Sequence, residues 1–85
     1  MTYDDLKEED KDRMREANHR NRWRLSSKQL ARLIKEHRNA KQSGDEYTCL
    51  LIEFRLCDIN FHTEVDLLHA GQYEKVLEMA QKMVV

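Results

Sequence analysis

The feature of this sequence whose chemistry is easiest to name is a basic block in its first half. Residues 11–41 hold eleven lysines and arginines against three acidic residues, a net charge of +8. Five arginines and a tryptophan lie within the twelve residues 13–24. Guanidinium groups bind phosphates and an indole ring stacks on bases, so this composition suits nucleic-acid binding. The candidate polyanion-binding residues are Arg13, Arg20, Arg22, Trp23, Arg24, Arg32, Lys35 and Arg38.

A plainer interpretation of the basic block is a solvated surface. The flanking segments are acidic, with net charges of −4 over residues 1–10 and −5 over residues 42–85, and they can neutralise the block within the chain or across a dimer. Exposed ion pairs of this kind add little stability. A basic patch is an electrostatic footprint and not a motif. Nucleic-acid binding through residues 11–41 is therefore the second of two functional hypotheses.

Three metal-ligating side chains recur in the second half of the chain. His62, Asp66 and His69 fall on one side of a helix expected there, and imidazole with carboxylate is the ligand chemistry of zinc or iron. Stable sites usually need a fourth ligand or a second such motif from another helix, and the sequence offers neither. The plainer interpretation is a polar surface facing solvent. These residues are weak metal candidates, and we expect no cofactor.

The sequence carries no motif that indicates catalysis. A glycine-rich phosphate loop is missing, and neither Ser26, Ser27 nor Cys49 lies in a nucleophile motif. The two cysteines, Cys49 and Cys57, have no C-x-x-C spacing and no further partners for a disulfide framework. We expect reduced, buried thiols and a protein that is not an enzyme.

A helix over residues 27–42 is the clearest local prediction. Ser26 can cap this helix, Gln29 can return the bond three residues on, and Leu25 can pack against Leu30. The apolar positions keep helical spacing up to Ser43-Gly44, where Gly44 suits a left-handed stop.

After Asp45, which can cap the next element, apolar residues recur at spacings of three and four from Tyr47 to Leu68. This persistence predicts one long helix. A strand over residues 50–56 is the alternative, because apolar and polar residues alternate there, but that pattern stops at Asp58. Gly71 then predicts a tight turn into a last helix that begins near Tyr73.

The predicted long helix is apolar on two sides. Its main stripe can be covered by the helices before and after it, which leaves a second stripe to be buried. Three covers remain open for the second stripe: the N-terminal arm, a second copy of the chain, or a foreign partner. The candidate anchors of such an interface are Ile52, Leu56, Ile59 and Leu67.

These patterns predict one all-α domain, a bundle of three or four helices with a long central helix. Residues 1–24 form a charged arm or helix, and residues 25–85 form the helical core. The first functional hypothesis is a small non-enzymatic regulator, adaptor or inhibitor that contacts another protein, including itself as a homo-oligomer. An acidic N-terminus and short apolar runs predict a cytosolic protein without membrane contact, in a style typical of phage products.

Overall fold

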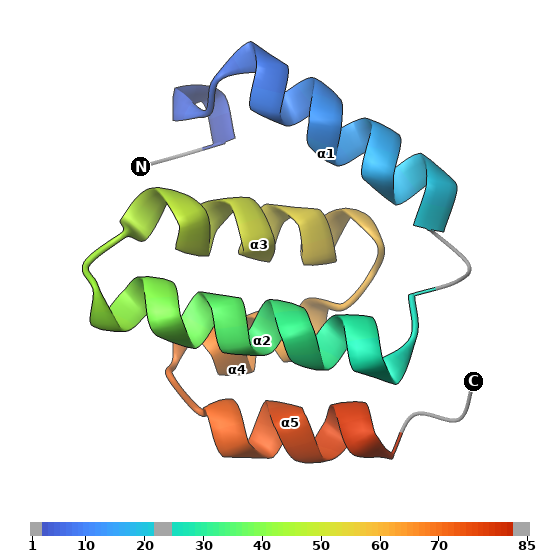
Figure 1. The fold of residues 1–85 in the computed structure, drawn as a ribbon, viewed down its shortest axis with the longest axis vertical. Helices are drawn as coiled ribbons and strands as arrows, with labels where there is room; N and C mark the ends of the chain where they lie inside the picture. The colour runs from blue at the N-terminus through green and yellow to red at the C-terminus, as the bar shows by residue number, and fades with distance from the viewer. Residues whose placement is uncertain (1–2, 22–24, 83–85) are drawn as a thin grey trace.

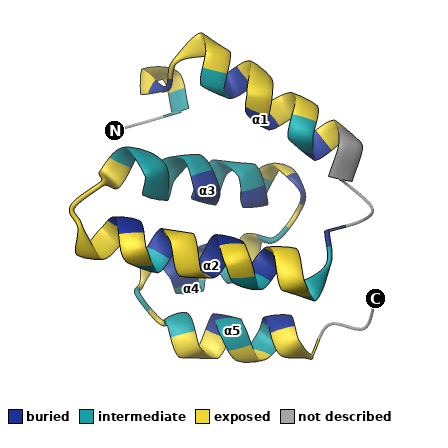
Figure 2. Ribbon diagram, in the orientation of Figure 1, coloured by how far each residue is buried: buried dark blue, intermediate teal, exposed yellow. Residues whose placement is uncertain are grey.

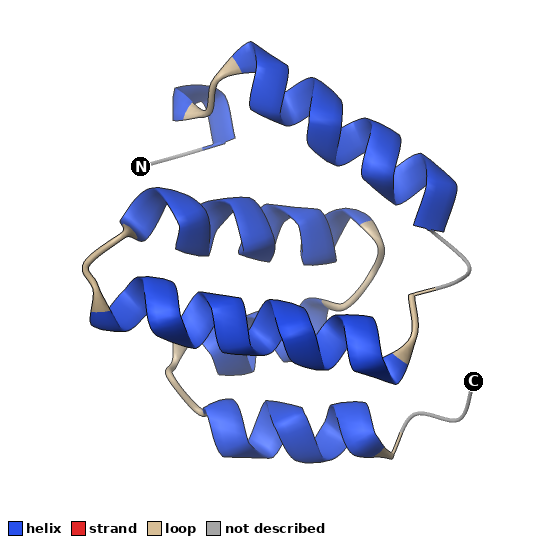
Figure 3. Cartoon of the chain, in the orientation of Figure 1, coloured by secondary structure: helices blue, strands red, loops and turns tan. Residues whose placement is uncertain are grey.

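The computed structural model describes residues 3–21 and 25–82, and every regular element in these ranges is a helix (Figures 1 and 3). This confirms the predicted all-α class. A short 3-10 helix (Tyr3–Asp5) precedes five α-helices: α1 (Glu8–Asn21), α2 (Ser27–Gln42), α3 (Glu46–Asp58), α4 (His62–His69) and α5 (Tyr73–Gln81).

Helix α2 has the bounds that the sequence predicts, and its first turn is held by a complete capping box. The backbone N–H of Gln29 donates to Ser26 Oγ at 3.2 Å, and the backbone N–H of Ser26 donates to Gln29 Oε1 at 2.9 Å. Leu25 and Leu30 are both buried. The helix stops before Gly44, whose φ of 78° is the left-handed conformation that glycine adopts without strain.

The single helix predicted from Tyr47 to Leu68 is wrong, because the chain breaks it into α3 and α4 at Asn60. Asn60 has a φ of 69°. Its N–H donates to the Cys57 carbonyl at 3.1 Å, and the Phe61 N–H donates to the Leu56 carbonyl at 2.9 Å. These two bonds form a Schellman motif, in which a left-handed residue terminates the helix. The alternative strand over residues 50–56 is wrong as well, since α3 covers it.

The apolar core lies entirely within the part of the chain from Leu25 onward. Helix α2 packs against α3, α4 and α5, and α4 packs against α3 and α5. The buried cluster holds Leu25, Leu30, Leu33, Ile34, Ile52, Leu56, Ile59, Val65, Leu68, Val76 and Ala80.

The second apolar stripe belongs to this core and does not form the expected contact surface. Ile52, Leu56 and Ile59 are 5%, 0% and 9% exposed, and Leu67 is half-buried against the core. The physical reason is the reversal at Asn60, which brings α4 back against α3. The prediction that these four residues anchor a partner or dimer interface is therefore corrected, since the chain's own helices cover them.

Helix α1 forms an outer layer on α3 (Figure 1). Its region contributes the buried residues Leu6 and Met14, which lie outside the main core cluster. Polar contacts add to this attachment, because the Tyr47 hydroxyl donates to Asp10 Oδ2 at 2.6 Å and accepts from the Lys7 backbone N–H at 3.0 Å. The N-terminal segment is thus a packed helix over Glu8–Asn21, the second of the two forms that the sequence left open.

The described part of the chain contains no helix with the length and apolar character needed to cross a bilayer.

Candidate functional site

The outer side of α2 carries a row of cations. Lys28, Arg32 and Lys35 are exposed, and Arg38 is half-buried at the edge towards α5. The buried residues of α2 lie on another side of the helix, so the helical spacing itself places the cations outward (Figure 2). We call these four residues the basic face of α2.

Within the described residues, the cations of the basic face are free of ion pairs, whereas Lys11, Arg13 and Arg15 of α1 are paired. Among the described residues, none of the four has a carboxylate oxygen within 4.0 Å. On α1, by contrast, Arg13 contacts Asp10 at 3.5 Å and Arg15 contacts Asp12 at 3.2 Å. The basic block predicted from the sequence is therefore divided into an ion-paired part and an unpaired part.

The remaining polyanion-binding candidates cannot be placed on this surface. Arg22, Trp23 and Arg24 lie outside the described residues, and so does the side chain of Arg20.

The weak metal candidates are not brought together as a site. His62, Asp66 and His69 are all exposed on α4, and His69 turns towards Glu53 instead. Within residues 3–21 and 25–82, no three histidine, cysteine, aspartate or glutamate side chains are grouped so that they could hold a metal ion. Helix α4 presents these three side chains to solvent, so within the described residues they do not converge on one point.

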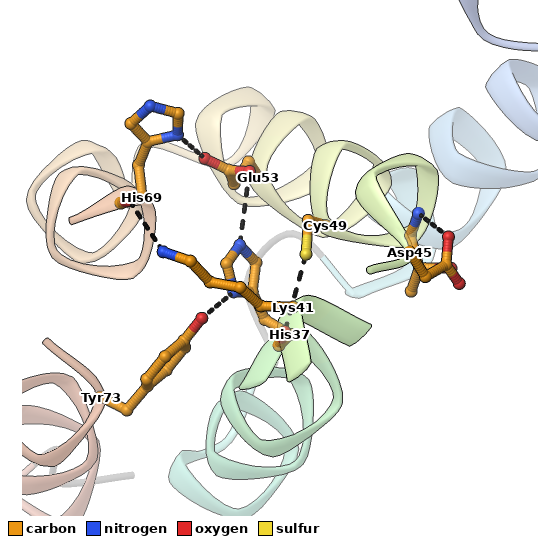
Figure 4. A network of polar contacts seen from close by, with 8 residues as sticks. His37, Lys41, Asp45, Cys49, Glu53, His69 and Tyr73 are labelled. Carbon is orange, nitrogen blue, oxygen red and sulfur yellow. Dashed lines mark hydrogen bonds and ion pairs between the residues drawn. The ribbon is translucent and has the colours of Figure 1, made fainter. Parts of the chain in front are cut away.

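A second polar site, which the sequence did not predict, surrounds the buried carboxylate of Glu53 on α3 (Figure 4). Glu53 Oε1 lies 2.9 Å from His69 Nδ1, at the end of α4. Its other oxygen, Oε2, lies 3.3 Å from Nε2 of His37 on α2, without the alignment of a hydrogen bond. Glu53 thus contacts two imidazoles from two different helices.

The chain of contacts continues from His37 to α5. His37 is 1% exposed, and its Nδ1 lies 2.9 Å from the hydroxyl of Tyr73. Burial, with smaller contributions from Cys49 and Glu53, raises the pKa of Tyr73, so its hydroxyl keeps its proton. This arrangement suits a hydrogen bond in which the Tyr73 hydroxyl donates to His37 Nδ1, while His37 Nε2 faces the Glu53 carboxylate. We call Tyr73, His37, Glu53 and His69 the Glu53 network.

Electrostatics keep the centre of this network charged. Burial alone would raise the pKa of the Glu53 carboxyl, but the contacts with His37 and His69 outweigh burial and lower the pKa below its ordinary value. An ionised carboxylate inside a protein requires such partners, because an unpaired buried charge is strongly unfavourable.

A hollow of about 420 Å³ opens beside the network. It is lined by His37, Lys41, Gly44, Glu46, Cys49, Leu50, Glu53 and His69. Lys41 reaches across it, and its Nζ lies 3.4 Å from the backbone carbonyl of His69.

The thiol in this hollow is poorly suited to nucleophilic chemistry. Burial, followed by the negative charge of Glu53, raises the pKa of Cys49, and the thiolate is the reactive form. Its Sγ lies 3.6 Å from the backbone carbonyl of His37. The ring of His69 lies on the other side of Glu53 from Cys49, so the two do not form a nucleophile and base pair (Figure 4). The hollow therefore lacks an activated nucleophile at Cys49.

Two signals in the sequence could have indicated the network. His37 lies among the apolar positions of α2, and Glu53 is an acid within an apolar run of α3. A buried acid and a buried histidine on neighbouring helices need each other as partners. The sequence could not supply the register that brings them within 3.3 Å of one another.

Comparisons with known proteins do not add to these observations, since no protein family, curated protein or solved structure matches the chain.

Proposed function

We propose that this chain is a non-enzymatic binding protein that contacts nucleic acid through the basic face of α2. The observation that carries the proposal is that Lys28, Arg32, Lys35 and Arg38 form no ion pair with any residue that the structure describes. Cations without carboxylate partners keep their full attraction for phosphates, because no internal ion pair has to be broken before the ligand binds.

The spacing of the four cations along α2 favours binding of a polymeric anion over binding of a small one. The four cations lie four, three and three residues apart, which corresponds to about 15 Å along the helix axis at about 1.5 Å per residue. A single small anion contacts one or two such groups. A nucleic-acid backbone presents a phosphate every few ångströms and can contact the whole row.

Contact with a foreign protein through an apolar patch has less support. Its predicted anchors, such as Ile52 and Leu56, are used in the core of the chain. An exposed apolar patch is the usual mark of such interfaces, and these residues do not provide one.

Binding of labelled oligonucleotides tests the proposal. A duplex and a single strand of about 20 nucleotides are titrated with the full chain at salt concentrations from 50 to 200 mM. With four phosphates neutralised, the slope of log K against log salt is about −3.6 for a duplex, so affinity falls about a hundredfold over this range. Failure of both oligonucleotides to bind at 50 mM salt would overturn the proposal.

Matched double variants locate the contact. Arg32→Gln with Lys35→Gln should weaken binding at least tenfold and reduce the salt slope by about two, one for each lost phosphate contact. The control is Arg13→Gln with Arg15→Gln, which removes two arginines that are already ion-paired on α1. Equal losses of oligonucleotide affinity in the two double variants would contradict a contact centred on α2.

A further inference from the structure

The Glu53 network connects four helices at one end of the bundle. Glu53 belongs to α3, His37 to α2, His69 to the end of α4, and Tyr73 to the start of α5. The last two residues flank the turn at Gly71, whose φ is 79°. Glu53 therefore holds the α4 side of the turn directly through His69, and the α5 side is held through His37 and Tyr73 (Figure 4).

We propose that the Glu53 network is an acid-sensitive latch, in which protonation of the Glu53 carboxylate releases the α4–α5 turn from α2 and α3. This inference does not depend on the proposed nucleic-acid contact.

Protonation of Glu53 weakens its contact with His69 and its contact with His37 at the same time. A neutral carboxylic acid no longer offers a full negative charge to His69 or His37. His37 has almost no access to water, so loss of the carboxylate charge leaves its ring without the anionic partner that faces it. Opening of the turn allows water to reach His37, and it also separates His37 from Tyr73.

The groups around Glu53 favour this response. The pKa of Glu53 is lowered by His37 from α2 and by His69 from α4, which outweigh the effect of burial. The titratable and charged groups that face the network are His37, Arg38 and Lys41 from α2, Glu46, Cys49 and Cys57 from α3, His69 from α4 and Tyr73 from α5.

The direction of the pH dependence follows from linkage. The folded-state pKa of Glu53 lies below its ordinary value, so its stabilising contribution is complete above the pKa of the unfolded chain. That contribution is lost as the pH falls through the folded-state pKa. The latch is therefore closed at neutral pH and opens in acid.

Amide exchange measured by NMR on the full chain tests the latch. Between pH 6 and pH 3, after correction for intrinsic exchange, protection of residues 69–73 should fall at least tenfold before protection in the middle of α2 changes. The midpoint should agree within half a pH unit with the carboxyl ¹³C titration of Glu53. Simultaneous loss of protection in all helices, or a midpoint more than one unit away, overturns the proposal.

Two variants separate the latch from general acid sensitivity. Glu53→Gln keeps the shape and an acceptor oxygen, so the turn should already be less protected at neutral pH and show no further transition at the wild-type midpoint. Glu78→Gln removes an exposed carboxylate that pairs with Lys82 on α5 and should keep the wild-type profile. An unchanged acid transition in Glu53→Gln overturns the latch. If that variant does not fold, the agreement of the two midpoints in the wild-type chain decides.

Discussion

Helices α1 and α2 carry similar numbers of basic residues but use them in different ways. On α1 the described arginines Arg13 and Arg15 are paired with aspartates one turn earlier, and the helix lies on the outside of α3. On α2 the cations have no ion pair in the part of the chain that the structure describes, and the opposite side of the helix forms the centre of the core. Basic composition alone therefore does not identify a binding surface, because local pairing decides which charges remain available.

The two helices also differ in what attaches them to the bundle. Helix α2 contributes Leu30, Leu33 and Ile34 to the main apolar cluster. Helix α1 contributes Met14 as its buried apolar residue, together with polar contacts such as those of Asn18. Burial of apolar area is the larger stabilising contribution in most domains, so α2 should matter more for stability than α1.

Truncation of one buried residue in each helix gives the largest expected effect. Ile34 is 0% exposed and lies in the core cluster, so Ile34→Ala should lower the free energy of unfolding by about 2–5 kcal/mol. Met14→Ala should cost less, about 2 kcal/mol or below, because the outer layer can relax around the smaller side chain. Urea denaturation of both variants measures the difference. A cost for Met14→Ala equal to that of Ile34→Ala would break the distinction between core and layer.

Removal of the buried amide in α1 should have the next largest effect. Asn18 Nδ2 donates to Asp58 Oδ2 at 3.0 Å and to the Arg55 carbonyl at 3.3 Å, and Arg55 Nε donates to Asn18 Oδ1 at 3.2 Å. Asn18→Ala leaves these partners without the amide, so it should lower the free energy of unfolding by about 1–2 kcal/mol. Faster amide exchange should be confined to α1. Asn39→Ala, at an exposed position of α2, is the control and should change little.

The all-α class, the bounds of α2 and two of the turns between helices could be predicted from the sequence. The capping box at Ser26, the cap at Asp45 and the glycines at positions 44 and 71 each have a strong local preference that the structure follows. Local signals of this kind act within four residues, so tertiary packing does not have to be known.

The break at Asn60 was missed because the apolar periodicity continues across it. Phe61, Val65 and Leu68 stay in helical register with α3, although the chain reverses. Asn60 is itself a signal, since asparagine is the residue after glycine that most readily adopts a positive φ. The unpredicted reversal is also why the contact surface was assigned to residues that the core uses. The Glu53 network depends on the same reversal, because His69 reaches Glu53 only after α4 has turned back.

The start of α2 allows a last and smaller test of the comparison. Its first turn contains no acidic residue and is held by Ser26, whereas the first turn of α1 contains Glu8, Glu9 and Asp10, which interact favourably with the helix dipole. Ser26→Ala should lower the free energy of unfolding by about 1 kcal/mol, because the hydroxyl that caps the first turn is lost.

The salt dependence of stability distinguishes the hydroxyl cap of α2 from the acidic first turn of α1. A neutral hydroxyl cap does not depend on ionic strength, so the cost of Ser26→Ala should be the same at 50 mM and 500 mM salt. Ser27→Ala, one position later, leaves the bond from Ser26 to Gln29 intact and serves as the matched control. Replacement of Glu9 by Gln on α1 should cost less, about 0.3–1 kcal/mol, and that cost should shrink in high salt because charge–dipole attraction is screened. If the Ser26 variant responded to salt as the Glu9 variant does, the two helices would share one mechanism of initiation, and the contrast drawn between them would not extend to their first turns.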